Sequence, residues 1–269
     1  MPRYDRLSML VSLILLGLVV SQVIELPTRT VSFVALGVPT TVYLSSRWFI
    51  GALLVILTGA GTDSIVRSHP EARDGVWGYS LSFWGLPCAV TLLSLLLLPL
   101  SPDKLFWLAG LALTGLLLSL IIIAQYHTID QRGRYYGVAR WGLNLAVYVS
   151  IFVFSAAIYG ARARSLLSAT AISVLGATLA AELLRGKPSW QAMRRAWLYS
   201  LIGGILLGEV AWALNHLSLG QAAGGLFFLL VFYVLSGLAK QHLRGRLVGR
   251  VLVEFAIVSL LGLGLIHMV

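Results

Sequence analysis

Charged residues are scarce in this sequence. Lys, Arg, Asp and Glu make up 11% of the 269 residues, whereas a soluble domain carries roughly 25%. Hydrophobic residues make up 58%, and most of them stand in long runs. The composition therefore excludes an ordinary soluble protein. It predicts a single polytopic membrane domain over residues 1–269.

Cysteine is also nearly absent. Cys88 stands alone, which excludes an intrachain disulfide and a cysteine-ligated metal site. The five histidines form no HxxxH or HExxH pair, so we expect no metal site. The sequence also lacks a GxSxG nucleophile motif, a Walker lysine and a dinucleotide fingerprint. These absences argue against an enzyme. The cofactor, if the protein binds one, is unknown, and ligation of a haem or chlorin by His216 or His242 is still open.

Long apolar segments dominate what is present. A bilayer core of about 30 Å needs about 20 apolar residues in a helix. Nine segments of this size are Leu7–Leu26, Trp48–Val66, Tyr79–Leu100, Leu105–Ala124, Trp141–Gly160, Leu166–Leu184, Trp197–His216, Gly220–Ala239 and Leu247–His267. The first is longer than the roughly 7–15 residues of a signal-peptide core, so we expect a retained signal anchor. The sequence predicts an all-α integral membrane bundle of about nine transmembrane helices, within a range of eight to ten.

One apolar segment, Thr28–Ser45, does not fit a spanning helix. It is rich in β-branched and aromatic residues and has Gly37, Val38 and Pro39 at its centre. Two short β-rich runs around a Gly/Pro turn predict a hairpin, which we expect to be a short extracytoplasmic element. A re-entrant segment buried among the helices is the alternative.

Basic residues predict the side of the membrane on which each loop lies. With the N-terminus in the cytoplasm, fifteen of the 20 lysines and arginines fall on the inner side, as the positive-inside rule requires. We therefore expect a multi-pass protein of the cell inner membrane with its C-terminus outside and Gln125–Arg140 as an aqueous cytoplasmic loop. The net charge of +10 indicates anionic lipid headgroups as partners, and nucleic acid is not expected.

Ionisable residues at membrane depth are candidates for function. Glu209 is expected about 20 Å into its helix, with Trp212 and His216 on the same face. This group predicts a ligand or proton site, although a structural glutamate that joins two helices is the plainer alternative. A second, inner polar cluster is predicted near the cytoplasmic face; its members are Asp63, Asn144, Glu182 and Glu254, together with Gln125 and His127. Ion pairs that fix helix ends would explain this cluster equally well.

Three stretches resemble an uncharacterised family of bacterial multi-pass membrane proteins. They are Gly61 to Pro70, Gln125 to Arg140, and Phe232 to Glu254. The resemblance covers most of the chain and implies architecture only, because no activity comes with the family.

A shorter stretch resembles a fragment of the CAAX-protease and abortive-infection family. It consists of Glu182 to Gly186 followed by Asn215 and His216. Ala181 stands where that family has the first of two glutamates, and the spacing to Arg185 is one residue short. An intramembrane protease is therefore the least favoured of three hypotheses for the function of this protein.

Two other classes of function come before it. The first is a non-enzymatic membrane protein, a scaffold or complex subunit that binds a lipid, a pigment or a quinone. The second is a proton-coupled or small-solute transporter, which Glu209 and the inner polar cluster favour. Transporters often have internal repeats and broken helices, and the sequence has neither.

Overall fold

The computed structural model describes residues 4–23, 29–35, 38–44, 46–69, 79–130, 132–161, 165–186, 189–216, 220–245 and 249–268. Its long helices are α1 (Tyr4–Val23), α2 (Ser46–Val66), α4 (Gly85–Leu97), α5 (Lys104–His127), α6 (Tyr136–Gly160), α7 (Ser165–Leu184), α8 (Trp190–Leu214), α9 (Gln221–Leu243) and α10 (Gly249–Met268). Two 3₁₀ turns, η1 (Ser80–Phe83) and η2 (Leu98–Leu100), flank α4.

Eight of the described helical segments are long and apolar enough to cross a membrane, with η1, α4 and η2 counted as one. Within α10, Val253–Gly262 forms a shorter apolar helix. The prediction of an all-helical, multi-pass membrane bundle is confirmed. A ninth crossing by α10 stays a prediction.

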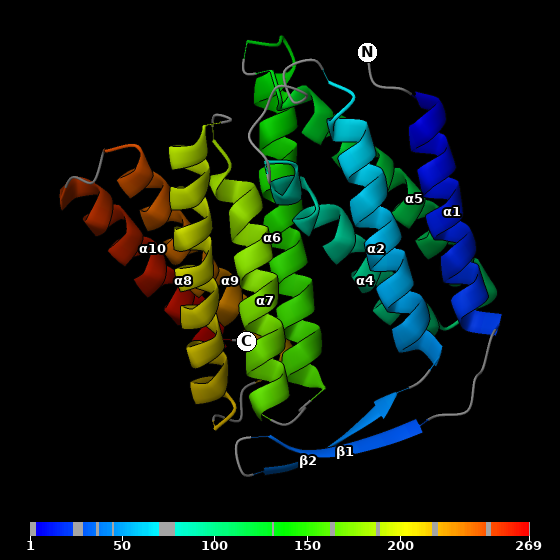
Figure 1. The fold of residues 1–269 in the computed structure, drawn as a ribbon. Helices are drawn as coiled ribbons and strands as arrows, with labels where there is room; N and C mark the ends of the chain where they lie inside the picture. The colour runs from blue at the N-terminus through cyan, green and yellow to red at the C-terminus, as the bar shows by residue number, and fades with distance from the viewer. Residues whose placement is uncertain are drawn as a thin grey trace.

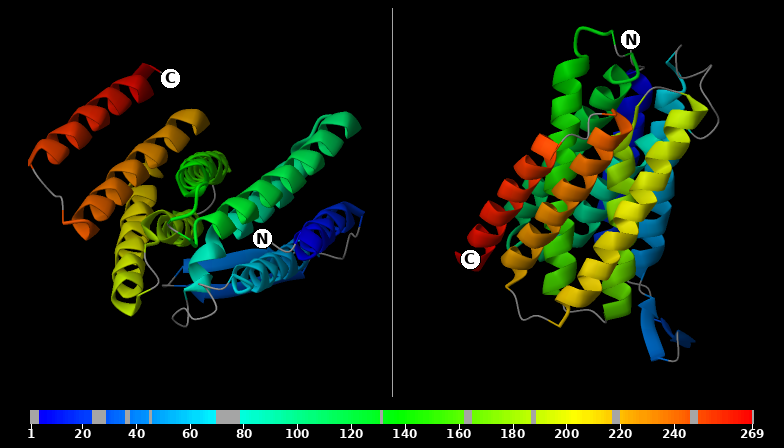
Figure 2. Two further views of the ribbon diagram at one scale, coloured as in Figure 1. Left: turned by 90° about the horizontal axis from the view of Figure 1, so that it is seen from above. Right: turned by 90° about the vertical axis from the view of Figure 1, so that its left-hand side faces the viewer.

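The helices form two groups that meet at α4 (Figures 1 and 2). Helices α1, α2 and α5 lie on one side of the bundle, and α7, α8 and α9 lie on the other. Helix α4 packs against α2 and α5 as well as α6 and α7, so it holds the two groups together. Fully buried Phe83, Leu86 and Phe228 belong to the core between them. Helix α10 lies outside this core and packs against α9.

Several helices extend beyond their apolar segments. Helix α8 begins at Trp190 rather than at the expected Trp197, because Ser189 caps it: the Ser189 Oγ accepts a hydrogen bond from the Ala192 N–H at 3.4 Å. Helix α6 likewise begins at Tyr136 rather than Trp141. Polar residues near the membrane surface are therefore held on helices.

The predicted aqueous loop Gln125–Arg140 is wrong in its extent. Gln125 lies in α5 and is fully buried, and Arg140 lies in α6. The residues that the structure describes between the two helices are 128–130 and 132–135. The physical reason is that the Gln125 amide nitrogen and the Arg140 guanidinium donate to neighbouring protein groups, as described below, so both residues can remain helical with these donors paired inside the protein.

The segment predicted as a hairpin contains two strands. Strand β1 (Arg29–Ala35) pairs antiparallel with β2 (Val38–Leu44), in a register that runs from Arg29 opposite Leu44 to Ala35 opposite Val38. Residues 36–37, which include Gly37 of the expected turn, lie outside the described residues. The strands lie beyond the end of the bundle opposite the N-terminus (Figure 1). Their position outside the cell stays a prediction.

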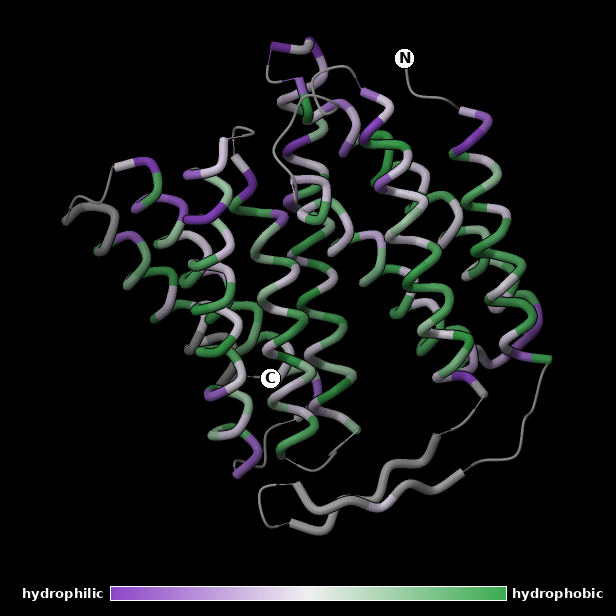
Figure 3. Tube along the Cα trace, in the orientation of Figure 1, coloured by the Kyte–Doolittle hydropathy of each residue, from purple (hydrophilic) through white to green (hydrophobic). Residues whose placement is uncertain are grey.

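Hydrophilic residues gather at the other end of the bundle, the end at which α1 begins (Figure 3). The helix ends that meet there carry Arg6, Arg67, Arg132, Arg134, Arg140, Arg185, Arg194, Arg195, Lys240 and Arg244. Among the basic side chains that the structure describes, only Arg47 and Lys104 belong to the opposite end. We call the end of the bundle at which α1 begins the basic end.

Helices α7 and α8 approach each other closely at two glycines. A Cβ added at Gly204 would stand 2.5 Å from the Ser173 carbonyl oxygen, and one at Gly208 would overlap the Ser173 hydroxyl. Gly204 and Gly208 stand four residues apart, which is the spacing that lets membrane helices pack backbone against backbone. This pair of helices forms the rigid wall beside which the cavity at the basic end opens.

Candidate functional site

A cavity of about 640 Å³ opens at the basic end between α6, α7, α8 and α9. Its volume is about twenty times the roughly 30 Å³ share of one water molecule in the liquid. The cavity can therefore hold a group much larger than a single small ion. Its basic lining residues are Arg140, Arg185, Arg195, Lys240 and Arg244. We call it the cationic cavity.

Among the residues that the structure describes, no aspartate or glutamate lines the cationic cavity. The ion pairs among the described residues are those of Arg67 with Asp63 and of Arg185 with Glu182. Arg195, Lys240 and Arg244 therefore have no carboxylate within ion-pairing distance in the part of the chain that the structure describes. Cations that share a cavity repel one another, and an anion in the cavity would relieve that repulsion.

The first turn of α8 adds to the positive potential. Ser189, Gln191 and Ala192 line the cavity at the N-terminus of this 25-residue helix. The N-terminus of a helix carries about half a positive charge and has unpaired N–H groups that favour an anion. The backbone and the side chains thus favour the same class of ligand.

Arg140 holds one wall of the cavity in place. Its Nη2 donates to the carbonyl oxygens of Leu183 at 2.6 Å and Arg185 at 3.2 Å. These carbonyls stand at the C-terminal end of α7, where a cation is stabilising. Arg140 therefore fixes the end of α7 against α6 while its guanidinium also faces the cavity.

Arg185 is held even more firmly. Its Nη1 donates to Glu182 Oε2 at 2.9 Å, and its Nη2 donates to Thr128 Oγ1 at 2.7 Å. Its guanidinium carbon stands 3.6 Å from the centre of the Phe83 ring, which is a cation–π contact. Only 3% of the Arg185 side chain and 1% of the Glu182 side chain are exposed. The floor of the cavity is thus a buried ion pair with a fixed geometry.

Gln125 of α5 connects the Glu182–Arg185 ion pair to the group of helices that contains α1, α2 and α5. Its Nε2 donates to the Phe83 carbonyl and to Glu182 Oε2, both at 3.0 Å. The remaining oxygens of the two side chains, Gln125 Oε1 and Glu182 Oε1, have no hydrogen-bond partner among the described residues. Gln125, Glu182 and Arg185 form a polar network across α5 and α7, which we call the buried network.

Tyr79 lies beside the network, just before η1. Burial raises the pKa of its phenol, while the charge of Arg185 acts in the opposite direction. The phenol therefore stays neutral near neutral pH and adds no negative charge to the cationic cavity.

The predicted inner polar cluster is brought together only in part. Glu182 is at its centre with Gln125, but Asp63 pairs with Arg67 on α2 at 2.8 Å. Glu254 is exposed on α10, and Asn144 is half-buried on α6. Membership was predicted from depth along each helix, and depth does not determine the face on which a side chain lies. Among the described residues, no group of three or more His, Cys, Asp or Glu side chains could hold a metal ion.

Glu209 and Trp212 lie on an exposed face of α8, and His216, two residues beyond the end of that helix, is exposed as well. The opposite face of α8, with Gly204, Gly208 and Ala211, packs inward. Binding of a ligand or a proton by this group stays a prediction.

The residues of the CAAX-protease resemblance lie at opposite ends of the bundle. Glu182 and Arg185 are at the basic end, whereas Asn215 and His216 follow α8 at its far end. A helix of 25 residues is about 37 Å long. Asn215 instead donates to Ser168 Oγ at 2.8 Å. These residues cannot act on one substrate atom.

Sequence reasoning missed the cationic cavity itself. From the sequence we used Arg195, Lys240 and Arg244 only to predict the side of the membrane on which each loop lies. A sequence signal exists, because the last turn of α9 and the first turns of α8 concentrate positive charge without any acidic residue. Which of those charges share a cavity depends on how the helices pack.

A family model described as a protein of unknown function (DUF5656) matches residues 26–269. No curated protein matches the chain, and no solved structure matches it.

Proposed function

Since the chain belongs to this family of proteins of unknown function, we propose a function from the geometry: the protein is a non-enzymatic membrane protein that binds a phosphate-bearing anion in its cationic cavity. The observation that carries this proposal is the lining of the cavity: the described residues that line it include five basic side chains and no aspartate or glutamate, and Glu182 pairs with one of the five, Arg185. A lipid headgroup and a soluble phosphate ester have the same chemistry, and the experiment below distinguishes them.

Phosphate is favoured over smaller anions for two reasons. Arginine presents a planar fork of donors that matches phosphate oxygens, and Arg195, Lys240 and Arg244, which have no carboxylate partner among the described residues, line the same cavity. The volume of about 640 Å³ also leaves room for an organic group beside the phosphate. Basic residues near anionic lipid headgroups contribute about 1 kcal/mol each.

A purely topological role would also concentrate positive charge at this end. Charges that serve topology alone need only face water. Here Arg185 is buried under the cavity by bonds to Glu182 and Thr128, and Arg140 is held by two carbonyls. Such fixed donors are what a binding site requires.

Replacing the free cations is expected to weaken binding. Arg195→Gln and Lys240→Gln should each lower the affinity for a phosphate ligand by about tenfold or more, because a hydrogen bond to a charged group contributes about 1.5–3 kcal/mol. The measurement is titration calorimetry of the detergent-purified protein with inorganic pyrophosphate, repeated with dioleoyl phosphatidic acid in phosphatidylcholine nanodiscs.

Arg194→Gln is the matched control, because Arg194 is adjacent in sequence and does not line the cavity. It changes the net charge by the same amount and should leave both affinities within about twofold, as expected for a screened surface charge. Equal losses in all three variants would mean a diffuse electrostatic effect and would overturn the proposal. Binding of pyrophosphate alone would identify a soluble ligand.

The orientation of the protein follows from the same charges. We expect the basic end to face the cytoplasm, with the N-terminus inside and the C-terminus outside. A fluorescent protein that folds only in the cytoplasm should be bright when fused after residue 135, and a periplasmically active phosphatase should be active when fused after residue 269. The reverse pattern would place the cationic cavity outside the cell.

Proton-coupled transport is the second candidate function. It is favoured by the buried network, in which a deeply buried carboxylate, Glu182, is linked to the cavity through Arg185. Uptake of pyrophosphate into proteoliposomes that depends on a pH gradient would support it. If pyrophosphate binds normally but is not taken up, the function is binding alone, either by this protein by itself or as a subunit of a membrane complex.

A further inference from the structure

A second cavity, of about 320 Å³, lies at the edge of the bundle between α6, α9 and α10, farther from the basic end. Its walls include Tyr148 of α6, Leu229 and Tyr233 of α9, and Val258 of α10. None of the described side chains that line it is charged. Tyr233 and Val258 are partly exposed, so the cavity is open toward the bilayer. We call it the apolar cavity.

The two cavities share one stripe of α9. Leu226, Leu229 and Tyr233 line the apolar cavity, and Lys240, Leu243 and Arg244 line the cationic one. Residues at intervals of three, four and seven lie on the same face of a helix, and these positions follow that spacing. Helix α6 also contributes to both cavities, through Arg140 and Tyr148.

The separation of the two cavities matches the dimensions of a lipid. Lys240 and Leu229 are eleven residues apart on α9, which corresponds to a rise of about 16 Å. This is about half of the roughly 30 Å hydrocarbon core of a bilayer. A hydrocarbon chain that runs from a headgroup in the cationic cavity toward the middle of the bilayer would therefore bring its terminal part beside Leu229. The rings of Tyr148 and Tyr233, which both line the apolar cavity, stand 6.0 Å apart.

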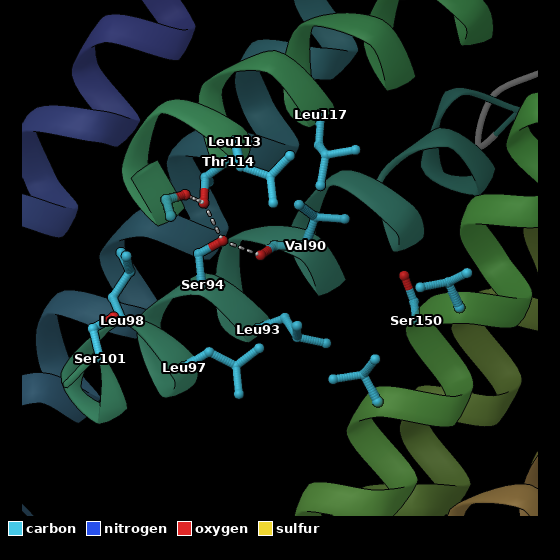
Figure 4. Close-up of a pocket in the computed structure, with 13 residues that line it drawn as sticks. Val90, Leu93, Ser94, Leu97, Leu98, Ser101, Leu113, Thr114, Leu117 and Ser150 are labelled. Atoms are coloured by element: carbon cyan, nitrogen blue, oxygen red, sulfur yellow. Dashed lines mark hydrogen bonds between the residues drawn. The ribbon is translucent and has the colours of Figure 1, made fainter. Parts of the chain in front are cut away.

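Another apolar cavity gives a contrast. It has a volume of about 210 Å³, lies between α4, α5 and α6, and is lined by Leu113, Ser94 and Thr114 (Figure 4). The hydroxyls of Ser94 and Thr114 bond each other at 2.8 Å. The described residues that line it include no basic side chain, so they would not select an anionic headgroup.

We infer that a single membrane lipid occupies both sites, with a phosphate headgroup in the cationic cavity and a hydrocarbon chain in the apolar cavity against α10. The inference rests on the proposed binding of phosphate and names its source as a lipid. It also gives α10 a role, because this helix forms the outer wall of the chain site and otherwise packs on α9 at the edge of the bundle.

Photo-crosslinking tests the position of the chain. The full-length protein is placed in phosphatidylcholine nanodiscs that contain phosphatidic acid with a diazirine near the end of one acyl chain. After illumination, mass spectrometry should find the label on peptides of α9 and α10 around Leu229 and Val258. Photoactivatable phosphatidylcholine, which lacks the net negative charge, should label these peptides no more than other helices.

Variants separate the chain site from the headgroup site. Leu229→Trp, which fills the apolar cavity, should abolish the excess label on α9 and α10, and Val258→Trp tests the same cavity from its other wall. Leu113→Trp fills the cavity of Figure 4 and should leave the label unchanged. Arg195→Gln with Lys240→Gln should remove the label by removing the headgroup site.

The outcomes distinguish the two proposals. Phosphatidic acid that binds normally in calorimetry but labels all helices equally would overturn the lipid-chain inference and leave the proposed function intact. A label on α9 and α10 that both tryptophan variants leave unchanged would overturn it as well. Absence of binding by both pyrophosphate and phosphatidic acid would overturn the proposed function itself.

Discussion

Glu182→Ala is expected to lower the free energy of unfolding by about 3–5 kcal/mol, because it leaves the Arg185 guanidinium buried without its counter-charge. The guanidinium cannot move to water easily, since Thr128 and the Phe83 ring hold it in place. The change also removes an acceptor for the Gln125 amide. The measurement is unfolding of the purified protein in mixed micelles of mild detergent and dodecyl sulfate, followed by tryptophan fluorescence.

Two controls isolate the buried pair. Asp63→Ala breaks the Arg67 ion pair, in which 55% of the arginine side chain is exposed, and should cost less than about 1 kcal/mol. The double variant Glu182→Leu with Arg185→Met should recover part of the loss, because removing both charges is cheaper than stranding one. A Glu182→Ala protein as stable as the Asp63→Ala protein would show that water reaches Arg185.

Gly204→Ala is expected to cost about 1–3 kcal/mol, because overpacking a tight helix contact forces the backbones apart. The added Cβ would stand 2.5 Å from the Ser173 carbonyl oxygen and 2.7 Å from the Ala177 Cβ. Neither group is the far end of a flexible side chain that could rotate away. Separation of α7 from α8 should also widen the cationic cavity, since both helices line it. Pyrophosphate affinity should therefore fall together with stability.

Gly203→Ala is the matched control for this change. A Cβ at Gly203 has no heavy atom within 4 Å, so the substitution meets open space. Alanine is also a better helix former than glycine by about 1 kcal/mol in water. Gly203→Ala should be neutral or slightly stabilising, and a loss equal to that of Gly204→Ala would rule out close α7–α8 packing as the cause.

The sequence by itself determined the helical spans. Runs of about 20 apolar residues form helices in a bilayer because the backbone must satisfy its own hydrogen bonds there, and this requirement is local to each segment. The gathering of basic residues at one end follows in the same way, since alternate loops of an antiparallel bundle meet at the same end. The four-residue spacing of Gly204 and Gly208 is also visible in the sequence and permits a close helix contact, but the partner helix, α7, is known only from the structure.

Tertiary structure decided which side chains meet. Gln125 and Glu182 are 57 residues apart in the chain yet share a hydrogen bond, and no periodicity in either helix specifies the other. Glu209 faces outward while Glu182 faces inward, although both are isolated carboxylates in apolar helices. The physical reason is that hydropathy fixes the depth of a residue in the membrane, whereas the rotation of each helix is fixed by packing against its neighbours. The cationic cavity, built from α6, α7, α8 and α9, exists only once those rotations are set.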